Sequence, residues 1–315
     1  MTPAERDLLR LINQRIARLS PDMQRAYLRA IAILRESLTL AEIVRRIESG
    51  SVIFDAHTIE RALLPYRDQL RTTVADGFTL SLRDLPAVVR NAVPALTFDY
   101  LNPRVVTAIR ALESSALATL TAEVQATVRE TVERGLTQGK PPVAIARGLR
   151  TVIGLAPNQA TYIDNLVAEL RALDPKALKR ELLGKRHKAM IEKAIKTGKP
   201  FTDAQVETIT SAYQKQWTAH NAFTNTRQAT LDSYRTANRE SFASAIERGL
   251  IPADRAKRRW VHWDGYVPAS RGRPEHIALH GETVRWDRPY SNGQTMAGFG
   301  DFNCRCVDWY FLARE

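Results

Sequence analysis

Apolar residues recur at intervals of three or four along two long stretches of the chain. The first stretch lies within residues 102–139 and the second within residues 202–249. This spacing puts the apolar side chains on one face of an α-helix. At a rise of about 1.5 Å per residue the first helix would be roughly 50 Å long, which implies an elongated body. The polar segment at residues 221–227 is a candidate break in the second helix.

Helix-start patterns are frequent in the first 250 residues. Several combine a capping side chain with a proline, or with a glutamate or glutamine three residues later. The capping boxes are Thr2–Glu5, Thr39–Glu42 and Thr202–Gln205, and the cap-proline pairs are Ser20-Pro21, Asn102-Pro103 and Asp174-Pro175. The sequence therefore predicts at least six helices before residue 250.

The composition of the sequence changes after Pro252. Helical periodicity stops there, and tryptophan, glycine, proline and histidine become frequent. The expected fold class is mainly α, with an elongated long-helix body and a small irregular α+β C-terminal module. The expected domains are an N-terminal helical region at 1–97, the body at 98–250 and the module at 251–315. The small core of the module is expected to be built by Trp260, Trp263, Trp286 and Trp309.

The composition of the 315-residue chain favours polyanionic partners. Lysine and arginine outnumber aspartate and glutamate by 46 to 34, a formal charge of +12. The N-terminus has no apolar signal region, and the prediction is that the membrane is not a partner. The most basic window is residues 176–199, with nine lysines and arginines against two glutamates. Its candidate phosphate-binding side chains are Lys176, Lys179, Arg180, Lys185, Arg186 and Lys188, and the alternative is a solvated basic face.

Motifs of common enzyme classes are missing from the sequence. Residues 135–140 resemble a phosphate-binding loop, but the spacing is one residue short and Pro141 stands where serine or threonine is needed. Nucleophile elbows, dinucleotide-binding glycine patterns and the paired histidines of zinc proteases do not occur. We therefore expect a protein that is not an enzyme.

One group of residues has metal-ligand character. His276 and His280 lie four apart in a turn between Pro274 and Gly281, which would put both imidazoles on one helix face. Cys304 and Cys306, the only cysteines, would share one face of a strand and suit a reducing compartment. Two nitrogens and two sulfurs complete a closed structural zinc site. The alternative is that all four are core thiols and hydrogen-bonded imidazoles. His262 is a spare candidate ligand.

The C-terminal residues resemble a known family. Trp260 and Trp263-Asp264, then residues 273–281 (RPEHIALHG), then residues 303–306 (NCRC), follow the order found in phage head morphogenesis proteins. These are the minor capsid proteins related to the phage Mu F protein and to the SPP1 portal-associated head protein. A weaker resemblance extends upstream through residues 98–103 (FDYLNP) and 153–160 (IGLAPNQA). The chain departs from the family at residues 225–230 (NTRQAT), where relatives usually carry Arg-Thr-Glu.

The resemblance implies a minor structural protein of the virion head, assembled in the cytoplasm of the host bacterium. Its implied partners are the portal protein and other head proteins, and its implied role is in head assembly and in DNA packaging or ejection. Packaged double-stranded DNA is a further candidate partner. Two other hypotheses stay open: a metal-dependent nuclease using His276, His280 and Asp264, and a DNA-binding protein without sequence preference.

Overall fold

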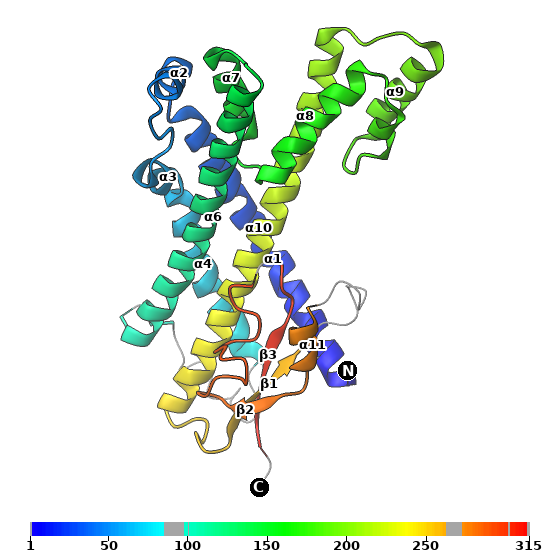
Figure 1. The fold of residues 1–315 in the computed structure, drawn as a ribbon. Helices are drawn as coiled ribbons and strands as arrows, with labels where there is room; N and C mark the ends of the chain where they lie inside the picture. Colours follow the sequence, from blue (N-terminus) through cyan, green and yellow to red (C-terminus); the bar gives the residue numbers. More distant parts are fainter. Residues whose placement is uncertain (1, 85–97, 100, 263–272, 302, 314–315) are drawn as a thin grey trace. The chain divides into compact units, whose positions relative to one another are not determined.

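The computed structural model describes residues 2–84, 98–99, 101–262, 273–301 and 303–313. Within them the chain forms ten α-helices and one three-stranded antiparallel sheet near its C-terminal end (Figure 1). The predicted fold class, mainly α with a small α+β C-terminal module, is confirmed. The helices are α1 (Pro3–Glu36), α2 (Leu40–Glu48), α3 (Ala56–Ala62), α4 (Leu64–Ser81), α6 (Pro103–Thr137), α7 (Pro142–Val152), α8 (Pro157–Arg171), α9 (Lys185–Thr197), α10 (Asp203–Glu247) and α11 (Pro274–Ala278), with 3₁₀ turns η1 (Leu82–Asp84) and η3 (Pro175–Lys179).

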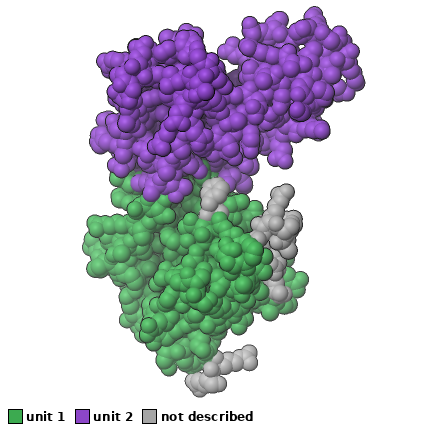
Figure 2. All heavy atoms as spheres, in the orientation of Figure 1, with its two compact units in different colours: residues 1–26, 65–116, 225–315 green, residues 27–64, 117–224 purple. Residues whose placement is uncertain are grey.

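The chain divides into two compact units, each made of segments far apart in the sequence (Figure 2). Unit 1 contains residues 1–26, 65–116 and 225–315, and unit 2 contains residues 27–64 and 117–224. Helices α1, α6 and α10 therefore supply residues to both units. The division into consecutive domains at residues 97 and 250 stays a prediction.

The two long helices are present where the apolar pattern predicts them, as α6 and α10. The candidate break at residues 221–227 is wrong, because α10 continues through it without interruption. Beyond this segment, polar side chains bond back to the helix itself: the Thr230 hydroxyl donates to the carbonyl of Thr226 (2.6 Å) and the Ser233 hydroxyl to that of Ala229 (2.7 Å). These bonds satisfy buried hydroxyls without ending the helix.

All three predicted capping boxes are confirmed by reciprocal hydrogen bonds. The pair Ser20-Pro21 does not begin a helix, contrary to the prediction, because α1 runs through it. The Ser20 hydroxyl donates to the carbonyl of Ile16 (2.7 Å) inside the helix. Ile16, Leu19 and Met23 are all buried, so one apolar stripe continues across the proline and its packing outweighs the local start pattern.

The C-terminal module belongs to unit 1 and is organised by the small sheet. Its strands are β1 (Ala256–Val261), β2 (Thr283–Arg285) and β3 (Val307–Leu312), in the order β2-β1-β3. Strand β1 lies in the centre and pairs antiparallel with both neighbours, with Val261 opposite Val307. These two valines pack with Leu231 and Tyr234 of α10 and with the first turns of α1. The sheet thus rests on helices from distant parts of the sequence.

Unit 2 contains a small core of its own around the basic window. Helix α8, turn η3, helix α9 and the first turns of α10 bury Leu170, Ile191, Ile209 and Tyr213 together. Trp217 of α10 packs against this core, with its ring centroid 5.4 Å from that of Tyr162. The basic window is therefore part of a folded helical lobe.

Helix α6 is the one described helix long and apolar enough to cross a membrane by length and composition, with a mean hydropathy of 1.2 over its most apolar window. Core helices of water-soluble proteins pass the same test. The property therefore carries no conclusion about a membrane.

Candidate metal centre

One imidazole and both thiols of the C-terminal module come together inside unit 1. Nδ1 of His276 lies 3.3 Å from Sγ of Cys304 and 3.8 Å from Sγ of Cys306. The three ligand atoms all lie within 4.8 Å of one another, and all three residues are buried. This cluster could hold a metal ion. The geometry brings together three of the four residues that the sequence singled out.

Helix α11 positions His276. It begins at Pro274, which suits the first position of a helix, and its short length leaves His276 as its one buried residue. The imidazole packs edge-on against the buried indole of Trp260, with ring centroids 5.3 Å apart. Its other nitrogen, Nε2, lies 3.3 Å from a carboxylate oxygen of Asp301. A carboxylate in this position orients the imidazole with Nδ1 toward the thiols, as in the carboxylate–histidine pairs of metal sites.

The two cysteines lie in the segment that leads into β3 and remain free thiols. The pKa of Cys304 is lowered to about 5, chiefly because Cys306 donates a hydrogen bond to it and also because the charge of Arg235 lies nearby, which together outweigh burial. The same hydrogen bond and burial raise the pKa of Cys306. One of the two sulfurs is therefore already disposed to be a thiolate, the form that binds metals.

Gly298 makes room for the Cys304 sulfur. Its φ of +67° is the left-handed conformation that glycine adopts without strain. A Cβ added at this position would collide with Sγ of Cys304 and lie 3.2 Å from the Arg235 guanidinium. The close approach of this backbone to the thiol requires glycine.

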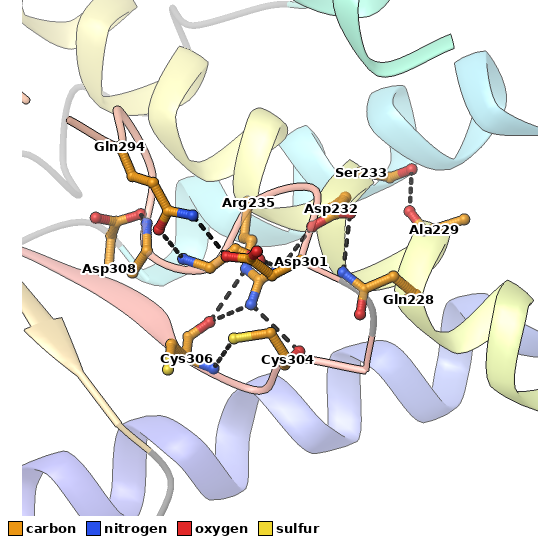
Figure 3. A network of polar contacts seen from close by, with 12 residues as sticks. Gln228, Ala229, Asp232, Ser233, Arg235, Gln294, Asp301, Cys304, Cys306 and Asp308 are labelled. Carbon is orange, nitrogen blue, oxygen red and sulfur yellow. Dashed lines mark hydrogen bonds and ion pairs between the residues drawn. The ribbon is translucent and has the colours of Figure 1, made fainter. Parts of the chain in front are cut away.

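A buried guanidinium from α10 holds the thiol segment in place (Figure 3). Arg235 forms an ion pair with Asp232, one turn earlier on the same helix. It also donates hydrogen bonds to the carbonyl oxygens of Gly298 (2.9 Å), Cys304 (3.4 Å) and Cys306 (3.1 Å). Burial by itself lowers the pKa of Arg235, but the Asp232 carboxylate more than offsets burial, so the pKa is raised and the group stays charged.

Sequence reasoning missed Arg235. Its position in the middle of a long helix, three residues after an aspartate, is also typical of an exposed helical ion pair. Only the packing of the module onto α10 shows that the pair is buried. The departure noted at residues 225–230 lies on the same helix, where Arg227 is half-buried; burial and the charges of Arg305 and Arg235 lower its pKa to about 10.

A second buried charge pair fixes the loop that follows β2. Arg258 of β1 contacts a carboxylate oxygen of Asp308 in β3 at 3.2 Å, and the Tyr290 hydroxyl donates to the same oxygen at 2.7 Å. The other Asp308 oxygen accepts from the backbone N–H of Ala297 (3.0 Å). The loop is therefore tied to the sheet immediately before Gly298, which supports the thiol position.

His280, the fourth predicted ligand, does not join the cluster. Helix α11 ends at Ala278, so His280 lies in the turn that follows and loses the shared helix face that the prediction assumed. Its Nδ1 instead accepts a hydrogen bond from the backbone N–H of His262 at 3.1 Å. Of the residues proposed for a nuclease, Asp264 lies outside the described residues, as does Trp263 of the family pattern.

The predicted nucleic-acid-binding residues lie in the helical lobe of unit 2 and differ in their surroundings. Arg180 pairs with Glu169, with Nε and a carboxylate oxygen 3.0 Å apart, and this pair raises its pKa. It therefore serves the fold of the lobe. The others are exposed or half-exposed: Lys176 and Lys179 in η3 and Lys185, Arg186 and Lys188 in the first turn of α9.

Comparisons of the chain with protein-family models, curated proteins and solved structures find no match. The resemblance to phage head morphogenesis proteins therefore rests on the residues quoted above and stays a prediction. The metal-ligand cluster rests on the geometry and does not depend on that resemblance.

Replacing Arg235 with methionine should destabilise unit 1 by about 3–5 kcal/mol, because Asp232 would remain buried without its partner and three carbonyls would lose their donor. Urea unfolding followed by tryptophan fluorescence measures the change. Arg239→Met is the matched control, since Arg239 lies one turn later and donates to Thr295 at an exposed position. Its expected cost is about 1 kcal/mol. Equal losses in the two variants would contradict the assigned role.

Replacing Gly298 with alanine should displace the Cys304 sulfur and expose the thiols. Gly293→Ala is the matched control, because Gly293 also has a positive φ (+82°) but has open space around its Cβ position. With metal removed by a chelator, the rate of thiol labelling by an aromatic disulfide reagent should rise more than tenfold in Gly298→Ala, equivalent to about 1.4 kcal/mol of opening free energy. Similar labelling rates in both variants would count against this packing.

Proposed function

We propose that this protein is a minor structural component of a phage head, associated with the portal, whose C-terminal module is held together by a structural zinc ion. One observation carries the proposal. The residues on which the family resemblance depends, RPEHIALHG at 273–281 and NCRC at 303–306, supply the side chains that meet at the metal-ligand cluster. The two motifs that carry the family resemblance thus contain the three side chains that form the metal-ligand cluster.

The ligand chemistry favours zinc among the divalent metals. Two thiolates and imidazole nitrogen are soft and borderline ligands, which suit zinc better than magnesium or calcium. The cluster is buried, and it lies in a module with short strands and a five-residue helix. A metal that links such segments contributes folding free energy directly. Reduced thiols agree with assembly in the cytoplasm of the host bacterium.

The proposed role is architectural and includes no catalytic step. The portal and other head proteins are the proposed partners, and the head interior is the proposed location. In that location the exposed cations of η3 and α9 would face packaged double-stranded DNA. The nuclease hypothesis loses support because His280, one of its three residues, points its Nδ1 at the backbone of His262.

If the chain is a head component, it should sediment with procapsids and with purified portal protein of the phage that encodes it. Quantitative mass spectrometry of gradient-purified procapsids and virions measures its copy number. A low but fixed ratio to the portal protein is the expected result. A chain that is made during infection but never enters either particle would contradict the proposed function.

Contact with DNA through the basic lobe should depend steeply on salt. Five phosphate contacts would give a slope of roughly −4 to −5 in a plot of log affinity against log salt concentration. The triple variant Lys185→Glu/Arg186→Glu/Lys188→Glu should flatten this slope by about 3. The control Arg110→Glu/Lys140→Glu/Arg147→Glu changes the net charge equally at exposed sites elsewhere. Equal slopes in the two variants would assign DNA binding to overall charge alone.

A further inference from the structure

The metal-ligand cluster has a neighbour directly after strand β1. In the antiparallel pairing of β1 with β3, Trp260 lies opposite Asp308 and Val261 opposite Val307. One position further, beyond the end of β1 and before the start of β3, His262 and Cys306 are the next pair of residues. Directly opposite residues of an antiparallel pair project their side chains to the same side. The register therefore places the His262 side chain on the same side of the sheet as the Cys306 side chain. Nδ1 of His262 lies 3.3 Å from Sγ of Cys306.

Three nitrogen–sulfur distances among these side chains are close to the edge length of a zinc tetrahedron. With Zn–N near 2.0–2.1 Å and Zn–S near 2.3 Å, a tetrahedral site separates a nitrogen from a sulfur by about 3.5 Å. The three nitrogen–sulfur separations here are 3.3 Å, 3.8 Å and 3.3 Å. These three separations lie close to the spacing that a bound ion would impose. The ligand atoms that all lie within 4.8 Å of one another are those of His276, Cys304 and Cys306, so a bound ion would draw the His262 imidazole closer to the other ligands.

His280 has a different part in this arrangement. Its Nδ1 accepts a hydrogen bond from the backbone N–H of His262 at 3.1 Å. A side chain held in this way orients the backbone of His262. His280 is accordingly a positioning residue.

We propose that His262 is the fourth ligand of the metal centre, which closes it as a tetrahedral site of two imidazoles and two thiolates. His262 comes from the position after β1, His276 from α11, and Cys304 and Cys306 from the segment before β3. The ion would join three separate segments of the module at one point, with Asp301 orienting His276. Four protein ligands leave no open position, which makes the centre structural.

The inference rests on the zinc that the proposed function includes, but it does not require a place in a phage head. Its test uses the purified full-length chain and zinc alone. Zinc content is measured by elemental analysis, and affinity by competition with a chromophoric chelator. The wild type should bind one zinc per chain. His262→Ala should weaken binding by more than about 100-fold, beyond the 10–100-fold typical of outer-shell residues. His280→Ala should retain one zinc and stay within that smaller range.

Two further measurements separate ligation from a general effect on folding. His262→Cys should restore zinc affinity, because a thiolate can replace the imidazole as a zinc ligand. Cobalt(II) bound to the wild type should give the intense visible bands of a tetrahedral site, and His262→Cys should strengthen the sulfur-to-cobalt absorption. Wild-type zinc affinity in His262→Ala, no rescue by His262→Cys, or a wild-type chain without zinc would each overturn the proposal. Sedimentation with procapsids is measured independently, so failure of one proposal does not decide the other.

Discussion

A buried guanidinium makes the thiol segment of the C-terminal module depend on the long helix beside it. Arg235 of α10 donates to three carbonyls of residues 298–306, a stretch outside the strands and helices that needs donors from elsewhere. The same side chain needs an acid because it is buried, and Asp232 supplies it from the same helix. One ion pair thus satisfies both requirements. The cysteines reach their positions through the backbone that Arg235 holds.

The proposed metal centre would add a second link across the same region. His276 and Cys304 are 28 positions apart, and their segments are joined by a short strand and irregular loops. Bringing such segments together costs conformational entropy, which a small core cannot fully offset. The core here is limited to Trp260, Tyr290 and a few smaller side chains around the thiols. A metal ion would offset this cost directly, while Asp301 and Gly298 preserve the ligand geometry.

The helical part of the fold could be predicted from the sequence because its determinants are local. Apolar spacing and capping boxes depend on residues within four positions, and they located α6, α10 and several helix starts. Ser20-Pro21 misled the prediction because burial on both sides of the proline outweighed a local pattern. Each unit is made of segments that are far apart in the sequence, and no local sequence pattern predicts which segments pack together.

Only part of the candidate site could be predicted from the sequence, because the rest depends on contacts between distant segments. His276, Cys304 and Cys306 were recognised by residue type, and the geometry brings them together. His280 was favoured over His262 because helical spacing can be read from sequence. The opposition of His262 and Cys306, which are 44 positions apart, depends on the pairing of β1 with β3. Arg235 was missed because burial of a helical ion pair depends on what packs against it.

The central claim is that these side chains form one closed metal centre. X-ray absorption at the zinc edge of the purified full-length protein tests it most directly, because it reports the ligand atoms around the ion. The expected spectrum has two sulfur neighbours at about 2.3 Å and two nitrogen neighbours at about 2.0–2.1 Å. A shell of nitrogen and oxygen without sulfur, or a protein that does not retain stoichiometric zinc, would contradict the account.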